Sequence, residues 1–279
     1  MTSPAASSPQ TPGAAVQVVA HRGSSEDVPE HTLAAYVKAI DDGADALECD
    51  VRLTADGHLV CVHDRRINRT SNGRGLVSTL ELSHLAALDF GSWKEGGEHA
   101  SDVEAPDWDR TSVLTLDRLL QLVVDAGRRV ELAIETKHPT RYAGLVERRL
   151  VELLDRFGLA HPVEGVRSPV RVMSFSQMSL RRMRTLAPRL PTVFLMERVP
   201  LRFRDGTLPK GVRIAGPSIE IVRAHPRFVA RLHRAGHRVH VWTVDRPDDV
   251  DLCLQLGVDA IITNRPGTVL SQVSRQPTR

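Results

Sequence analysis

Short apolar runs alternate with longer amphipathic stretches along most of the chain. This pattern is typical of repeated strand and helix units around a parallel sheet. Eight strands are predicted, at residues 16–20, 45–50, 129–135, 171–175, 192–195, 212–216, 240–244 and 259–263. Eight such units favour an α/β fold of the closed (β/α)8 kind, a TIM barrel, over an open doubly wound sheet.

Glycine follows four of the predicted helices directly. The amphipathic stretches end at Gly43, Gly127, Gly236 and Gly257, where a residue without a side chain adopts the left-handed conformation that ends a helix. The first predicted strand, in contrast, is not followed by a glycine-rich phosphate loop. Nucleotide-binding α/β folds are therefore disfavoured.

The second unit is longer than the others and contains a hairpin signal. A two-residue turn at Asp56-Gly57 would fold the chain back, and counting outward from it pairs Asp50 with His63. Because parallel strands need a long crossover, the run LVCVH after this turn is not the next barrel strand. We therefore predict that residues 55–113 form an insertion on the barrel.

Composition and length fit one globular domain. The chain has 279 residues, of which 41% are hydrophobic and 25% charged, with a formal net charge of +3, and a single barrel commonly needs about 250 residues. Residues 1–15 are rich in Ser, Pro and Ala and read as a flexible tail, which leaves residues 16–273 for the barrel domain. The arginines are scattered, which argues against a nucleic-acid partner.

Three further features limit the function classes. Cys49, Cys61 and Cys253 show no CxxC spacing, so neither a zinc site nor a disulfide framework is indicated. No apolar segment approaches the roughly 20 residues that cross a bilayer, and no signal-peptide pattern opens the chain. We therefore expect a cytoplasmic protein without stable membrane insertion; the sequence does not indicate its oligomeric state.

Charged residues stand at the ends of the first three predicted strands, where TIM barrels carry their catalytic groups. They are His21, Arg22, Glu48, Asp50, Glu135 and Lys137. Glu48 and Asp50 are two apart, so both carboxylates lie on one face of a strand. Two like charges about 4 Å apart repel by roughly 4 kcal/mol at an effective dielectric near 20. Three converging carboxylates therefore require either a metal ion, with oxygen ligation favouring Mg²⁺, Ca²⁺ or Mn²⁺, or neutralisation by Arg22 and Lys137 in a structural salt-bridge network.

The order of these motifs resembles the glycerophosphodiester phosphodiesterase family. The stretch from HRG at residue 21 to HD at residue 63 follows the family's order of HRG, PENT, GAD, E-x-D-V, T-x-DG and HD. The resemblance continues in RTSNGRG, LAIETK, MSF, VWTVD and GVDAIITNRP. It extends from about residue 17 to residue 268.

The resemblance implies a metal-dependent TIM-barrel enzyme that hydrolyses small glycerophosphodiesters to glycerol 3-phosphate and an alcohol. It assigns His21 and His63 as catalytic residues, Glu48, Asp50 and Glu135 as metal ligands, and Arg22, Lys137, Glu30 and Trp242 as substrate-binding residues. The implied cofactor is Mg²⁺ or Ca²⁺, with Mn²⁺ as a further candidate. Trp242 could instead close the core, and Glu30 could instead be an acid that suits the start of a helix. Which histidine is the acid, whether water or a glycerol hydroxyl attacks, and which headgroup is preferred stay open.

Three positions depart from the family pattern, and three rival functions remain. His31 stands where the family usually has Asn, Leu114 replaces a common Pro, and Asn264 replaces a common Asp. None belongs to the matched catalytic set, but the departures at His31 and Asn264 leave the exact substrate preference open. A phosphodiesterase for lysophospholipids or inositol phospholipids should have an apolar rim, which the sequence does not indicate. A non-catalytic phosphodiester-binding barrel should have lost a histidine or carboxylate of the set. A structural barrel would use residues 55–113 as its interaction surface.

Overall fold

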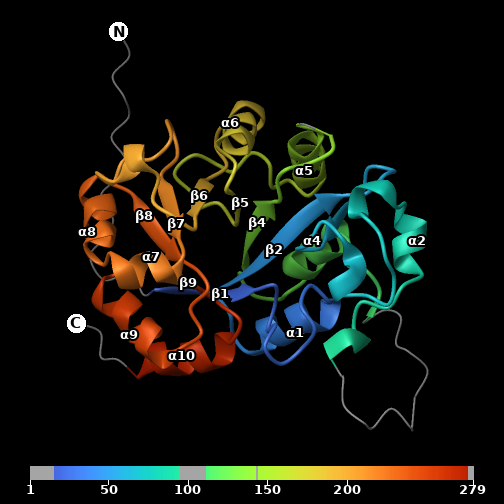
Figure 1. Cartoon of the computed structure of the whole chain (residues 1–279), viewed down its shortest axis with the longest axis horizontal. Coiled ribbons are helices and arrows are strands. Elements are labelled where there is room, and N and C mark those ends of the chain that lie inside the picture. The colour runs from blue at the N-terminus through green and yellow to red at the C-terminus, as the bar shows by residue number, and fades with distance from the viewer. Residues whose placement is uncertain (1–15, 95–110, 143, 276–279) are drawn as a thin grey trace.

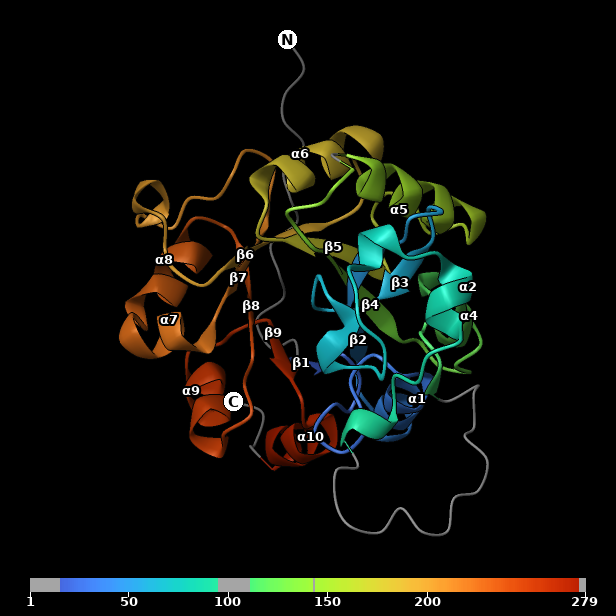
Figure 2. The same cartoon turned by 45° about the vertical axis from the view of Figure 1, so that its right-hand side comes forward.

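Eight parallel strands close into a barrel in the computed structural model, which describes residues 16–94, 111–142 and 144–275. The strands run in the order β1, β9, β8, β7, β6, β5, β4, β2, and β1 also pairs with β2, which closes the barrel. Figure 2 shows the helices arranged in a ring around these strands. The eight predicted strands and the TIM-barrel architecture are thereby confirmed. The barrel strands are β1 (Gln17–His21), β2 (Ala46–Leu53), β4 (Glu131–Thr136), β5 (Val170–Ser174), β6 (Thr192–Met196), β7 (Ile214–Pro217), β8 (Arg238–Val241) and β9 (Ala260–Thr263).

The helices follow the strands with one exception. Between β6 and β7, within the continuous stretch described from residue 144 to 275, the chain forms only the 3₁₀ helix η4 (Leu201–Phe203). The four glycines predicted to end helices all have positive φ, between 66° and 90°, as predicted. The helices of the outer ring are α1 (Leu33–Asp41), α4 (Leu116–Val124), α5 (Leu145–Arg156), α6 (Gln177–Leu186), α7 (Ile219–Ala224), α8 (Arg227–Arg234), α9 (Pro247–Gln255) and α10 (Pro266–Ser274).

The interior of the barrel is layered, because alternate residues of each strand point inward. The middle layer is apolar and consists of Val19, Ala46, Ala133, Met173, Val193, Leu195, Ile214, Ala260 and Ile262. Below it, toward the amino ends of the strands, Glu131 bonds to Gln17 and Arg171. Above it, at the carboxyl ends, lie the charged residues that the sequence singled out. The strand ends therefore position the candidate site on an apolar floor.

The predicted insertion forms a small substructure beside the carboxyl end of β2 (Figure 1). Its strand β3 (Leu59–Cys61) pairs antiparallel with β2 and is not part of the barrel, as predicted. The insertion also contains η1 (Ile67–Arg69), η2 (Val77–Thr79), α2 (Leu82–Ala86) and η3 (Ser92–Lys94). It has its own apolar cluster, formed by Val60, Val62, Ile67, Val77, Leu85, Phe90 and Val113. Residues 95–110 of the insertion and the tail predicted for residues 1–15 lie outside the described residues.

The register predicted for this hairpin is wrong by one residue. Val62, not His63, lies opposite Asp50, and its backbone N–H donates to the Asp50 carbonyl at 3.0 Å. The reason is that the connecting loop has three residues, 55–57, instead of two, and ends in Gly57 with φ of 89°. A three-residue loop with a left-handed residue is a common hairpin connection. His63 consequently follows β3 and lies outside the strand pairing.

The three cysteines lie in the interior of the protein. Cys49, Cys61 and Cys253 are free and buried, and all three pack in the apolar clusters between strands and helices. Across the described residues, no helix combines the length and the apolar composition that crossing a membrane requires.

Candidate active site

Three carboxylates meet at the carboxyl ends of two neighbouring strands. Glu48 and Asp50 share one face of β2, and Asp50 is directly beside Glu135 in the register between β2 and β4. Each of the three offers an oxygen atom within 4.8 Å of the others, and all three residues are buried. The convergence expected from their spacing is therefore confirmed.

Two cationic side chains balance only part of this charge. Asp50 lies 3.0 Å from Nε of Arg22 and 3.2 Å from Nζ of Lys137, and Lys137 also lies 2.9 Å from Glu135. Among the described residues, no Arg or Lys side chain comes within ion-pair distance of Glu48. Its Oε2 accepts a hydrogen bond from the backbone N–H of Arg22 at 3.1 Å. A salt-bridge network accounts for Asp50 and Glu135 but leaves Glu48 without a cation.

The electrostatics of the cluster fit a hard divalent cation. Burial, reinforced by the charge of Asp50, raises the pKa of Glu48 well above its usual range and that of Glu135 to about 8. Burial also acts to raise the pKa of Asp50, but Lys137, together with His31 and Arg22, outweighs it and lowers that pKa. With all three carboxylates ionised, the cluster keeps one negative charge in excess over Arg22 and Lys137. Three oxygen donors with excess negative charge are the kind of ligand set that Mg²⁺, Ca²⁺ and Mn²⁺ prefer.

His21 is held in one tautomer by its neighbours. Its Nδ1 lies 2.7 Å from Oδ1 of Asn264, whose Nδ2 donates to Asp245 at 2.7 Å. Because the amide oxygen of Asn264 can only accept, Nδ1 of His21 carries the proton and Nε2 keeps its lone pair. Nε2 lies 4.0 Å from Oε2 of Glu48. Burial, followed by the charge of Arg22, lowers the pKa of His21 to about 3, which keeps the ring neutral.

The side chain of His63 is more exposed to solvent than that of His21. Its side chain is 34% exposed, and Nδ1 lies 2.7 Å from Oδ1 of Asp64. Asp64 in turn pairs with Arg69 at 2.8 Å. The backbone oxygen of His63 accepts hydrogen bonds from Nε and Nη2 of Arg52 at 2.9 and 2.7 Å. The position of the main chain at His63 is thus fixed independently of its imidazole ring.

Glu30 belongs to an ion-pair network and not to a helix start. It accepts from Arg22 at 3.1 Å and from Arg69 at 2.8 and 2.7 Å, whereas α1 begins at Leu33 and is capped by Thr32. Burial alone would raise the pKa of Glu30, but hydrogen bonds from Arg69 and the charge of Arg22 lower it to about 2. Sequence reasoning did not single out Arg69, although it opens the RTSNGRG motif that supported the resemblance.

His31 lies beneath the carboxylates. It is buried, its Nε2 is 3.0 Å from Oδ2 of Asp50 and its Nδ1 is 2.8 Å from the hydroxyl of Tyr36. Tyr36 donates that hydroxyl proton to the backbone oxygen of Glu48 at 3.0 Å. His31 and Arg22 are also the two non-glycine residues with positive φ in the described chain, at 62° and 60°. This location gives His31 a role in holding Asp50 in place.

Trp242 contributes to both the core and the rim of the site. Its ring packs against the apolar middle layer, and its Nε1 donates to the backbone oxygen of Gly216 at 2.7 Å. The same ring meets Phe175 edge to face at a centroid distance of 5.4 Å. The Nζ atom of Lys137 lies 6.0 Å from the centre of Phe175. Trp242 and Phe175 therefore form an aromatic wall at the carboxyl ends of the strands, and Trp242 also packs in the core.

Comparison with known proteins agrees with this geometry. Residues 21–268 match the model of the Glycerophosphoryl diester phosphodiesterase family. The chain belongs to this family. A Mycobacterium tuberculosis protein named "Probable glycerophosphodiester phosphodiesterase 1" is 48% identical over 254 residues, covering 90% of this chain and 89% of the relative. A Bacillus subtilis "Glycerophosphodiester phosphodiesterase" is 33% identical over 258 residues, covering 90% and 84%.

Solved structures of glycerophosphodiester phosphodiesterases share the barrel. A phosphodiesterase of Oleispira antarctica, solved in complex with the product sn-glycerol-3-phosphate, superposes with a TM-score of 0.78 at 24% identity, covering 93% of this chain and 97% of that one. A putative glycerophosphoryl diester phosphodiesterase of Silicibacter pomeroyi gives 0.77 at 24% identity, covering 95% and 94%. At this identity the likeness establishes the fold, while the family match establishes the phosphodiesterase class.

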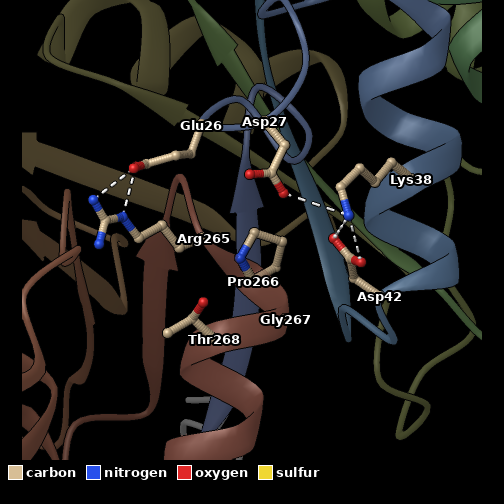
Figure 3. Close-up of a pocket in the computed structure, with 8 residues that line it drawn as sticks. All are labelled: Glu26, Asp27, Lys38, Asp42, Arg265, Pro266, Gly267 and Thr268. Atoms are coloured by element: carbon tan, nitrogen blue, oxygen red, sulfur yellow. Dashed lines mark hydrogen bonds and ion pairs between the residues drawn. The ribbon is translucent and has the colours of Figure 1, made fainter.

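A pocket separate from the carboxylate cluster lies between α1 and α10. It has a volume of about 360 Å³. Figure 3 shows its charged residues paired with one another: Glu26 with Arg265, and Lys38 with both Asp27 and Asp42. Each of these charged side chains is already ion-paired, and the lining has three acids against two bases.

Proposed function

We propose that the protein hydrolyses glycerophosphodiesters to sn-glycerol 3-phosphate and an alcohol, with His21 and His63 as the acid-base pair. Glu48, Asp50 and Glu135 hold a divalent cation in this proposal. The observation that carries it is the buried cluster of three carboxylates in which Glu48 has no cationic partner, beside a histidine whose Nε2 is free to accept a proton. The product bound to the Oleispira antarctica relative supports the substrate class.

A divalent cation held by Glu48, Asp50 and Glu135 would supply positive charge at the phosphate. Arg22 and Lys137 provide further positive charge for the phosphate oxygens. His21 accepts a proton from the attacking hydroxyl at Nε2, because Asn264 keeps the proton on Nδ1. His63 protonates the leaving oxygen as the P–O bond breaks, and Asp64 stabilises its charged form. Water attack and attack by the neighbouring glycerol hydroxyl both begin with this proton removal, and ³¹P NMR separates them, because only the second route passes through a cyclic phosphate.

One assay tests this function. Turnover of glycerophosphocholine is measured before and after exhaustive chelation, and again after Mg²⁺, Ca²⁺ or Mn²⁺ is added back. We expect activity to disappear on chelation and to return with at least one of these ions. Full turnover in protein shown to be free of metal would contradict the cation site, and no turnover with any ion would contradict the substrate class.

We also propose that residues 16–273 act as a single domain whose insertion, residues 55–113, borders the active-site mouth. The position of β3 and η2 beside the end of β2 supports this arrangement. A cytoplasmic location remains an expectation from the sequence.

A further inference from the structure

A second, smaller pocket is lined by charged side chains that are all Arg or Lys. The charged residues around it are Arg52 on β2, Arg65 in the insertion, Lys137 after β4 and Arg141 before α5. No carboxylate is among the lining residues in the described chain. This composition is the opposite of the pocket in Figure 3, where acids and bases pair with each other.

The positive charge of this pocket is only partly offset. Lys137 is shared with Asp50 and Glu135, and Arg52 donates to a backbone oxygen and not to a carboxylate. Arg65 and Arg141 are exposed, and within the part of the chain that the structure covers neither forms an ion pair. Burial lowers the pKa of Arg52, although the charges of Asp50, Glu135 and Asp64 act to raise it, and the like charge of Arg65 adds a smaller lowering. Arg52 and Arg65 therefore lie close enough to interact as like charges.

The pocket adjoins the candidate active site. Lys137 lines it while contacting the carboxylate cluster, and Arg52 lines it while holding the backbone of His63. The hydroxyl of Tyr142 donates to the backbone oxygen of Ser78 at 3.1 Å, which joins the loop before α5 to the insertion. The guanidinium of Arg141 lies 5.6 Å from the centre of the Tyr142 ring. One arginine from the insertion and one from the barrel therefore flank a single opening.

We propose that this pocket is a subsite for a phosphate group carried by the leaving alcohol. The substrate class is then a glycerophosphodiester whose alcohol bears a second phosphate, an inference that rests on the proposed function. Because Lys137, Arg65 and Arg141 line the same pocket, a substrate phosphodiester at Lys137 has room to extend its leaving alcohol toward the two arginines. Guanidinium groups suit phosphate because they can donate two parallel hydrogen bonds. The inner space is about 30 Å³, room for about two waters, so the phosphate lies at the mouth between the exposed arginines.

Three substrates test the subsite: glycerophosphocholine, with a cationic leaving alcohol, glycerophosphoglycerol, with a neutral one, and glycerophosphoglycerol 3-phosphate. We measure kcat/KM for each with the wild type, with Arg65→Gln, Arg141→Gln and the double variant, and with the control Arg156→Gln. Arg156 is 68% exposed at the end of α5, so the control removes one charge far from the pocket.

We expect the wild type to prefer the phosphorylated substrate over glycerophosphoglycerol. The double variant should reduce that ratio of specificity constants about tenfold, mainly through KM, since each exposed ion pair contributes modestly. The control should keep the ratio, and added salt should shrink it. Equal kcat/KM for the two substrates in the wild type, or an unchanged ratio in the double variant, would overturn the subsite while turnover of glycerophosphocholine upholds the proposed function. Absence of turnover on all three substrates would overturn both.

Discussion

Replacing His63 with alanine separates a chemical role from a structural one. The side chain is 34% exposed and its one hydrogen-bonding partner among the described residues is Asp64, itself 32% exposed. Surface pairs of this kind contribute at most about 1 kcal/mol, which for a chain of this size corresponds to a Tm change of about 2 to 4 °C. The hydrogen bonds from Arg52 reach the backbone oxygen of His63 and survive the substitution. His63→Ala should therefore remain folded with nearly the same Tm.

The effect on turnover should be much larger. General acid-base catalysis typically contributes about 10²- to 10⁴-fold, equal to roughly 3 to 5 kcal/mol of activation free energy. We expect kcat on glycerophosphocholine to fall by about that factor while KM stays within about threefold. Circular dichroism melting and steady-state kinetics on the same preparation measure both quantities.

A histidine on the same hairpin provides the matched control. His58 is 54% exposed and lies 3.2 Å from Asp56, so it resembles His63 in exposure and partner but lies at the loop end. His58→Ala should leave kcat within about twofold. If His63→Ala lost less than threefold in kcat, or if both variants lost activity equally, His63 would have no part in proton transfer.

Three further predictions concern the metal ligands, the tautomer of His21 and a buried carboxylate. Glu135→Ala should stay folded but bind Mn²⁺ at least about 100-fold more weakly in calorimetry, because one of three charged ligands is lost; unchanged affinity would exclude it as a ligand. Asn264→Leu should lower kcat by roughly 10- to 100-fold with little change in KM, since Nδ1 of His21 loses its acceptor; an unchanged kcat would contradict this role. Burial acts to raise the pKa of Glu147, but hydrogen bonds led by His138 lower it to about 2, so its stabilisation is present above about pH 4.5 and is lost as the pH falls toward 2. Glu147→Gln should accordingly lower the free energy of unfolding at pH 7 by about 1 to 3 kcal/mol, seen as a lower Tm. The difference in Tm between the variant and the wild type should become smaller by pH 3; a difference that does not change with pH would contradict this.

The strands and the carboxylate cluster were predictable because both follow from short-range patterns. Short apolar runs marked every barrel strand to within about three residues at each end, and the spacing of Glu48 and Asp50 placed both on one face. Parallel strands in register then bring Glu135 beside them. These predictions need only the pleat of a strand and the rule that barrel sites lie at carboxyl ends.

The errors and omissions arose where a single residue or a tertiary contact decides the geometry. One additional loop residue before His58 shifted the hairpin register, and a two-residue turn could not be told from a three-residue one by the residues TADG. The partnership of His21 with Asn264 joins positions 243 apart in sequence. Arg65 and Arg141 meet at one opening only because the insertion packs on the loop before α5. No local pattern carries such information.

The pairing of β1 with both β2 and β9 has a consequence for biosynthesis. One edge of β1 can pair with β2 early in synthesis. The other edge stays unpaired until β9 has been made, because the partner residues in β9 lie about 240 positions later in the chain. At about 5 to 20 residues per second, a ribosome needs roughly 12 to 50 s to make that stretch. During this interval the nascent barrel has two exposed strand edges, which are prone to pair with other chains. A chain stopped before β9 should therefore collect in aggregates or on chaperones, and releasing it with β9 supplied as a separate segment should restore a soluble barrel.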